Sequence, residues 1–367
     1  MNITFYLPTL TQPRHHKRIY SLRDRYFVKV YAFDRGLYRK NALKIDALYI
    51  LGEMANKSYF KRLQAYIKLI KSILNERNHT DLFYFFTIDF ALIGFLFLKR
   101  NRYIYEIGDF AYLGFGTAFR NILTKLDAKI IKKSFLTILT SEGFKRYLTK
   151  FVQASDISKN TLVIPNRLSD KILQFERNTA PFQEVSSLSF GFAGLLRYPD
   201  TILRFAKIIG DRYSNHQFHF FGDGPMRNQV EELVKKYKNI FFHGPYKNPE
   251  EIGKIYRMID ICVACYDTNG LNQRLAEPNK LYEAIYFGTP IIVSKDTYLA
   301  EVVISKGIGY TVDAHYDEEI IALLDNLTLK SLNKTRSKQL EIASDELLYS
   351  EREIIQYIET SESYPTV

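Results

Sequence analysis

Short apolar segments alternate with amphipathic segments along most of the chain, and this alternation constrains the fold more than any other feature. The first apolar segment, NITFYLP, precedes the helix-forming RHHKRIYSLRD and then a second apolar segment, VKVYAF. The series continues with the β-branched and aromatic segments LFYFFTI, RYIYEIG, FLTILTS and TLVIPN. Strands that alternate with helices pair in parallel beneath helical layers, so the sequence predicts a doubly wound α/β fold.

The chain is long enough for two such sheets. Its 367 residues exceed one ordinary core, and residues 169–189 show no sustained period. A second series of strands and helices begins at LSFGFAG. We predict an N-terminal Rossmann-like domain over residues 1–172 and a C-terminal one over 173–344, with a helix over 345–362 that packs back on the first. Two such domains that face each other form a cleft, in which loops at the carboxyl ends of strands bind ligands.

The charge is distributed unevenly between the two halves. Residues 1–185 hold 31 Lys and Arg against 15 Asp and Glu, whereas the remainder is mildly acidic. KSYFKRLQAYIKLIKSIL and RNILTKLDAKIIKK place these cations beside apolar residues. Basic amphipathic helices favour an anionic membrane surface, although the same apolar faces also suit an ordinary core with solvated lysines. No nucleic-acid-binding motif is present, so we do not expect nucleic acid as a partner.

The cysteines and the most apolar run restrict the compartment. Cys262 and Cys265 lie in DICVACYD, which indicates a buried strand, and no second pair follows to complete a zinc site. So few cysteines suit a reducing cytoplasm. Leu82–Leu98 carries Asp89 at its centre, and a bilayer span needs about 20 nearly uncharged residues, so we expect no transmembrane helix and no signal peptide.

The segment PNKLYEAIYFGTPIIVS, Pro278–Ser294, carries the clearest chemical signal. It predicts a short helix, a Gly-x-Pro stop and a buried strand. A helix start offers free amides to an anion, Lys280 adds a cation, and Glu283 suits hydroxyl groups such as those of a ribose. The alternative from the residues alone is a solvated ion pair between Lys280 and Glu283.

The same segment resembles the nucleotide-sugar motif of GT-B glycosyltransferases, especially the family 4-like enzymes of bacterial polysaccharide synthesis. Further parts agree in order and spacing: FGFAGLLRYPD, FHFFGDGPMRNQVEEL, FFHGPYKNPEEIGKIYRMIDICVACY, and LTSEGFKRYL followed by LVIPNRLSD. The resemblance covers most of residues 130–315 and, loosely, the first 130. It implies the GT-B fold, with two Rossmann-like domains facing across a cleft.

In such enzymes a glutamate at the position of Glu283 holds the donor ribose, nearby amides meet the diphosphate, and a basic residue after the first donor strand assists. The resemblance thereby implies a donor-binding set of Asn279, Lys280, Leu281, Glu283, Arg197 and Tyr246. Arg197 is otherwise a surface arginine before a helix. Gly222 and Gly224 are better explained as tight-turn glycines than as phosphate ligands.

Two positions depart from the family pattern. The family's second glutamate, eight residues before Glu283, is Leu275 here, and Glu277, two residues further on, is out of register. The strand end YEIGDF often contains His-Asp in the family, but this chain has Gly108 followed by Asp109. Asp109 is our candidate catalytic residue, a general base for an acceptor hydroxyl. It is also suited to holding a loop or capping a helix.

The basic stretch TQPRHHKR, which follows the first strand, supplies candidate acceptor-binding residues. Arg14, His15 and His16 would meet an anionic acceptor or a donor phosphate, or form a solvated basic loop. Two adjacent histidines do not make a metal site, and no Asp-x-Asp motif ends a strand. We therefore expect no metal and no cofactor, because a nucleotide-sugar is a substrate.

These observations together predict a hexosyltransferase-type glycosyltransferase. We expect it to transfer a sugar from a nucleotide-sugar donor, a UDP-sugar, to a lipid-linked saccharide for capsule, O-antigen or exopolysaccharide. We also expect it to rest on the inner face of the bacterial cytoplasmic membrane. The resemblance favours retention of the anomeric configuration. The alternatives are an inverting transferase with Asp109 as base, a nucleotide-sugar 2-epimerase of the same fold, and a non-catalytic sugar-nucleotide or lipid-binding subunit.

Overall fold

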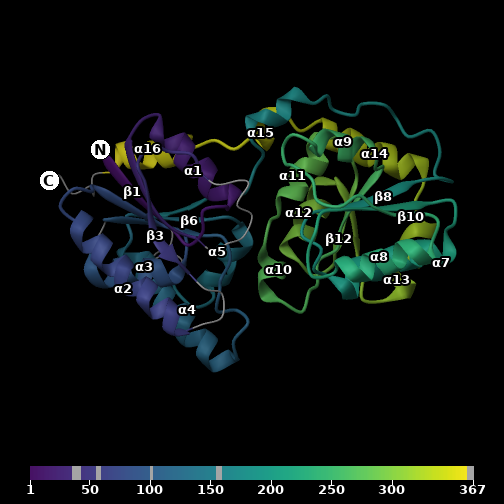
Figure 1. Ribbon diagram of the computed structural model, residues 1–367. Helices are drawn as coiled ribbons and strands as arrows, with labels where there is room; N and C mark the ends of the chain where they lie inside the picture. The colour runs from purple at the N-terminus through teal and green to yellow at the C-terminus, as the bar shows by residue number, and fades with distance from the viewer. Residues whose placement is uncertain (35–42, 55–58, 100–101, 154–158, 362–367) are drawn as a thin grey trace. The chain divides into compact units, whose positions relative to one another are not determined.

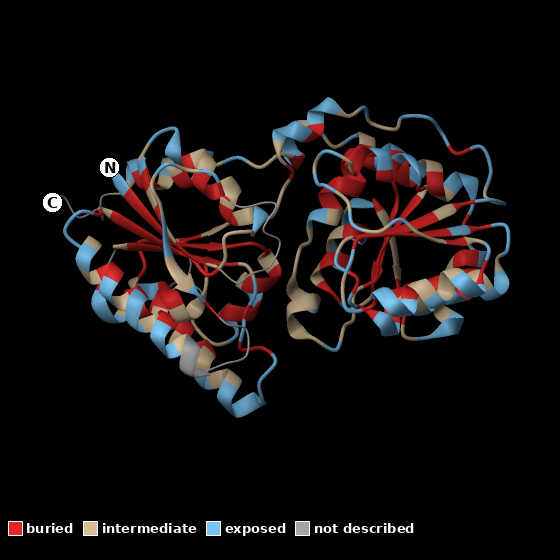
Figure 2. Cartoon of the chain, in the orientation of Figure 1, coloured by how far each residue is buried: buried red, intermediate tan, exposed pale blue. Residues whose placement is uncertain are grey.

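The protein forms two compact α/β units (Figure 1). The structure is a computed structural model that describes residues 1–34, 43–54, 59–99, 102–153 and 159–361. The first unit comprises Met1–Pro165 and Ser350–Val367, and the second comprises Asn166–Tyr349. In each unit the strands lie in the buried middle layer, with helices above and below (Figure 2).

The first unit is built on a parallel sheet with the order β3-β2-β1-β4-β5-β6-β7. Its strands are β1 Asn2–Leu7, β2 Phe27–Asp34, β3 Leu48–Glu53, β4 Leu82–Phe85, β5 Tyr103–Ile107, β6 Leu136–Leu139 and β7 Thr161–Val163. Its helices are α1 Pro13–Arg23, α2 Tyr59–Glu76, α3 Ile88–Phe97, α4 Thr117–Lys133, α5 Glu142–Thr149 and α16 Arg352–Thr360. Helices α1 and α16 cover one face, and α2, α3 and α4 cover the other (Figure 1).

The second unit repeats this architecture with the strand order β10-β9-β8-β11-β12-β13. Its strands are β8 Ser189–Ala193, β9 Gln217–Phe221, β10 Ile240–Phe242, β11 Ile261–Ala264, β12 Ile291–Ser294 and β13 Gly309–Val312. Its longer helices are α7 Arg204–Arg212, α8 Arg227–Lys236, α9 Ile252–Arg257, α11 Asn279–Tyr286, α12 Tyr298–Lys306, α13 Asp317–Asp325 and α14 Leu329–Leu340, and its short ones are α10 Leu271–Leu275 and α15 Ser344–Leu347. Both sheets are parallel, which confirms the predicted α/β fold.

The strand orders locate where each unit can bind a ligand. In the first sheet the order reverses between β1 and β4, and in the second between β8 and β11. Doubly wound sheets bind ligands outside the carboxyl ends of the strands at such a switch point. The segments that follow these four strands therefore define the candidate sites.

The strand β11 holds the two cysteines as the sequence predicts. Cys262 lies in the strand and Cys265 directly after it, and both are free and buried. Burial raises the pKa of the Cys262 thiol to about 12, so this group stays protonated and inert. Over the described ranges, no helix combines the length and the apolar character that a bilayer crossing requires.

The predicted helix over residues 345–362 is shorter than expected. The structure ends α15 at Leu347 and begins α16 at Arg352. Between them, the Tyr349 amide donates a 2.7 Å hydrogen bond to the Leu168 carbonyl, beside a bridge from Leu168 to Leu348. These backbone groups pair with a distant segment and therefore do not continue a helix.

Candidate functional site

The helix α11 begins in the way that the sequence predicts. Pro278 precedes it in an extended conformation, without a side-chain cap. The Leu281 amide donates a 3.1 Å hydrogen bond to the Pro278 carbonyl, so this predicted phosphate donor is already engaged. The amides of Asn279 and Lys280, at the first two helical positions, have no intrahelical acceptor. An anion at this helix start would meet these two N–H groups and the positive end of the helix dipole.

Lys280 extends from α11 across the end of β8. Its Nζ lies 5.0 Å from the Phe192 ring centroid and 5.9 Å from that of Tyr266. A Cβ on Gly194 would lie 2.5 Å from this nitrogen, so the absence of a side chain there leaves room for the ammonium. No ion pair joins Lys280 to Glu283, although the structure describes both, and the interpretation as a solvated pair is therefore wrong.

Glu283 is buried and held from two sides. Only 5% of the residue's surface is exposed. Asn248 Nδ2 donates a 3.0 Å hydrogen bond to Oε1, and the Tyr256 hydroxyl donates one of 3.3 Å to Oε2. The Tyr256 ring stacks on Phe287 at 4.8 Å, which fixes its hydroxyl. Each carboxylate oxygen keeps a second lone pair, so the fixed carboxylate can accept further hydrogen bonds from a ligand's hydroxyl groups.

Arg197 and Tyr246 complete the predicted donor set. Arg197 is exposed in the segment after β8, where its Nε donates a 2.9 Å hydrogen bond to the Tyr198 hydroxyl. The Tyr198 ring lies 4.9 Å from the Tyr266 ring that Lys280 also approaches. Burial, and then the charge of Glu283, raise the pKa of Tyr246. The structure therefore gathers the predicted cations around Tyr266 and places Tyr246 near the carboxylate.

The turn at Gly222 and Gly224 has the structural role that we predict. Both residues have positive φ, and a Cβ on Gly222 would lie 1.8 Å from the Gly194 carbonyl oxygen. Glu277, two residues after the position of the missing family glutamate, accepts a hydrogen bond from the Tyr282 hydroxyl. Burial raises the pKa of Glu277. Because Glu277 already bonds to Tyr282, we assign it no role in binding a ligand.

The predicted acceptor residues lie in the first turn of α1. His15 is 2% exposed and packs on Phe86, with ring centroids 3.9 Å apart. His16 Nε2 lies 2.6 Å from the Leu10 carbonyl oxygen, and burial lowers the pKa of this histidine. Arg14 Nε lies 3.2 Å from Glu106 Oε1. Of the three, His15 belongs to the core, and Arg14 keeps two terminal guanidinium nitrogens that donate no hydrogen bond to the described residues.

Asp109 is exposed just beyond the carboxyl end of β5. The sequence did not predict that the fully buried Glu106, in β5, pairs with Arg14 and Arg18. It also did not predict that Asn248 and Tyr256 hold Glu283. These partners come from distant segments, so neither spacing nor composition indicated them.

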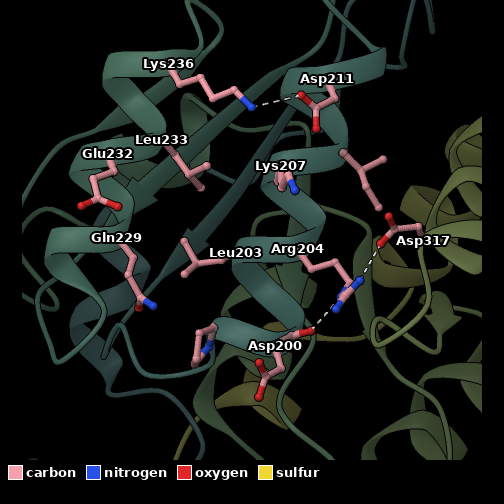
Figure 3. Close-up of a pocket in the computed structure, with 12 residues that line it drawn as sticks. Asp200, Leu203, Arg204, Lys207, Asp211, Gln229, Glu232, Leu233, Lys236 and Asp317 are labelled. Carbon is pink, nitrogen blue, oxygen red and sulfur yellow. Dashed lines mark hydrogen bonds and ion pairs between the residues drawn. The ribbon is translucent and has the colours of Figure 1, made fainter.

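A groove of about 470 Å³ lies apart from these residues, between α7 and α8 and beside α13 (Figure 3). Its cations are largely neutralised, because Arg204 pairs with Asp317 at 2.8 Å and Lys236 lies 3.7 Å from Asp211. None of the predicted site residues lines it. Over the described ranges, no three His, Cys, Asp or Glu side chains gather to hold a metal ion.

The two parallel Rossmann-like units define the fold class as GT-B. Residues 183–344 match the family described as Glycosyl transferases group 1. The predicted fold and the resemblance to this group of glycosyltransferases are thereby confirmed. Membership of family 4 stays a prediction.

Three known proteins are similar to this chain, one in sequence and two in structure. The chain is 25% identical over 223 residues to the succinoglycan biosynthesis protein ExoL of Rhizobium meliloti (strain 1021), a match that covers 56% of this chain and 53% of that relative, about half its length. Its fold is similar to sucrose-phosphate synthase (tll1590) from Thermosynechococcus elongatus, with a TM-score of 0.70, 13% identity and 98% of each chain covered. Anabaena Alr3699/HepE in complex with UDP gives 0.69 at 14% identity, covering 98% of this chain and 100% of the other. At such identities the structures show the fold alone.

Proposed function

We propose that the protein transfers a hexose from a UDP-sugar to a saccharide acceptor in the synthesis of an exopolysaccharide. The observation that carries this proposal is the carboxylate of Glu283, fixed by Asn248 and Tyr256 one turn from Lys280. Two similar proteins support it, since one is a succinoglycan biosynthesis protein and the other, Alr3699/HepE, was solved in complex with UDP-glucose.

In this proposal the donor diphosphate occupies the start of α11. The Asn279 and Lys280 amides, the Lys280 ammonium and Arg197 would stabilise the negative charge that develops on the leaving diphosphate, without a metal ion. Glu283 would accept hydrogen bonds from the ribose hydroxyls, and the segment around Tyr246 would meet the base. We propose retention of the anomeric configuration; an inverting reaction would instead use Asp109 as the base.

A thermal-shift series with UDP, GDP, ADP and uridine tests the donor site. A ligand at 100 times its dissociation constant stabilises the native state by about 2.7 kcal/mol, so UDP should raise the unfolding temperature clearly above the other nucleotides. Glu283→Ala should abolish the shift, whereas the exposed Glu232→Ala on α8 should retain it. If no nucleotide stabilises the protein, or if Glu283→Ala responds like the unsubstituted chain, the proposed donor site is wrong.

We further propose that the acceptor is a lipid-linked saccharide and that the protein binds the cytoplasmic membrane surface peripherally through α2 and α4. Both helices expose apolar side chains, including Leu63 and Ile67 on α2 and Phe119 and Ile122 on α4. Lysines and arginines alternate with apolar residues along α4, TAFRNILTKLDAKIIKK, and these cations suit anionic lipid. Residues 57 and 58 of the predicted basic helix lie outside the described residues.

Liposome flotation tests this surface. The protein should float with vesicles that contain phosphatidylglycerol and remain unbound with purely phosphatidylcholine vesicles, because each basic residue near an anionic surface contributes about 1 kcal/mol. The double substitution Phe119→Ser and Ile122→Ser should reduce the floating fraction. Equal flotation on both vesicle types, or no flotation at all, would contradict the proposed membrane contact.

A further inference from the structure

Arg14 carries two terminal nitrogens that the protein does not use. Its side chain is 15% exposed, and its Nε lies 3.2 Å from Glu106 Oε1. The guanidinium occupies the space beside Gly108, where a Cβ would lie 1.6 Å from Nη1 and 2.2 Å from Nη2. Within the described part of the chain, neither Nη1 nor Nη2 donates a hydrogen bond. A nearly buried guanidinium with unused donors favours an incoming acceptor atom.

Glu106 holds Arg14 together with a second arginine. Glu106 is fully buried, and its Oε2 already accepts hydrogen bonds from Arg18 Nε at 2.9 Å and from the Tyr84 hydroxyl at 2.5 Å. Glu106 therefore engages both guanidinium groups, and Arg18 is 2% exposed whereas Arg14 is 15% exposed. Of the two, Arg14 is the guanidinium that an incoming anion can reach.

Arg14 lies at a place in the fold where doubly wound sheets bind ligands. Arg14 lies in the first turn of α1, which follows β1, and it contacts the end of β5 at Gly108. Sheet order in this unit reverses between β1 and β4, so Arg14 stands at the switch point of the first sheet. The start of an 11-residue helix adds the positive end of its dipole.

We propose that Arg14 anchors an oxyanion site in the first unit, which takes a phosphate or carboxylate group of the acceptor. This inference rests on the proposed transferase function and names a chemical property of its acceptor. The planar guanidinium offers a fork of parallel N–H groups, which matches the two oxygens of either group. Gly108 is the specificity element, because any side chain there would displace the guanidinium.

The site is tested with inorganic phosphate in a thermal-shift titration at constant ionic strength, in the presence of saturating UDP. Saturating UDP occupies the proposed donor site, so a remaining response to phosphate reports a second oxyanion site. The unsubstituted protein should show a saturable rise of the unfolding temperature. Arg14→Met should weaken the apparent phosphate affinity roughly tenfold or more, as expected for a lost charge-assisted hydrogen bond.

Two further variants keep the test decisive. Gly108→Ala leaves every charge in place but displaces the guanidinium, so it should also lose the response. Arg23→Met removes an exposed arginine at the other end of α1 and should retain it. The inference is overturned if Arg14→Met and Gly108→Ala keep the phosphate response, or if saturating UDP abolishes it in the unsubstituted protein. A normal UDP shift in these variants would show that the donor site is intact. A failure of the oxyanion site is thereby distinguished from a failure of the proposed donor site.

Discussion

Asp127 should make the stability of the first unit depend on pH in an unusual direction. This carboxyl lies in α4 with none of its surface exposed, and the Tyr112 hydroxyl donates a 2.8 Å hydrogen bond to its Oδ2. Burial raises the pKa of Asp127 from 3.8 to about 7. The folded state holds the proton more tightly than the unfolded chain does. The stability from the protonated group is therefore complete below about pH 4 and is lost as the pH rises through about 7.

The magnitude follows from the two pKa values. The pKa of Asp127 is 3.8 in the unfolded chain and about 7 in the folded protein. Relative to low pH, the free energy of unfolding therefore falls by about 2 kcal/mol at pH 5 and by about 4 kcal/mol at pH 8. Asp127→Asn removes the ionisation and keeps an oxygen for the Tyr112 hydroxyl. Relative to the unsubstituted protein, we expect the variant to gain about 2–3 kcal/mol between pH 5 and pH 8.

Urea unfolding followed by circular dichroism at pH 5 and pH 8 measures this difference. The amide nitrogen of the variant enters a buried environment, so a constant cost adds at both pH values and only the change with pH is diagnostic. The control is Asp24→Asn, whose side chain is 78% exposed and which should respond by less than about 0.5 kcal/mol. A variant whose advantage is the same at both pH values would refute the reasoning.

Two further substitutions address the chemistry. Tyr256→Phe removes one of the hydrogen bonds on Glu283, so calorimetric titration should show UDP affinity reduced about 2- to 10-fold. The affinity for 2′,3′-dideoxy-UDP should not change, because this nucleotide lacks the ribose hydroxyls. An equal loss for both nucleotides would indicate a merely structural role. Asp109→Ala should lower kcat by about 10²–10⁴ at unchanged UDP affinity if the carboxylate is the general base, and undiminished turnover with acceptor membranes would remove it from the mechanism.

Local pattern was sufficient to predict most strands and the start of α11, because each strand is a short apolar run bounded by polar residues. The same kind of pattern contained a signal that we did not use. His15, Arg18, Ile19 and Leu22 have the spacing of one helical face, and all four are buried in α1. That spacing places His15 in the core, where it packs on Phe86, rather than among ligand-binding residues.

Other features depend on pairs of residues that sequence spacing does not connect. Glu106 and Arg18 are 88 positions apart, and Asn248 and Glu283 are 35 apart. Each pair forms because the fold packs a helix against a strand or loop from a distant part of the chain. A single sequence predicts that helices cover the sheet, but it does not show which side chains meet there.

The two departures from the family pattern have different physical consequences. At Gly108 the chain lacks the side chain that the resemblance leads one to expect, and the guanidinium of Arg14 fills the space instead. A cation thus stands beside Asp109 in place of a histidine. At Leu275 no comparable replacement occurs, since Glu277 is engaged by Tyr282 within the unit. The cation in the first unit favours an anionic acceptor, whereas the apolar residue in the second removes a hydrogen-bond acceptor from the segment that precedes α11. Neither departure removes Asn248 or Tyr256, so both leave unchanged the two hydrogen bonds that hold Glu283.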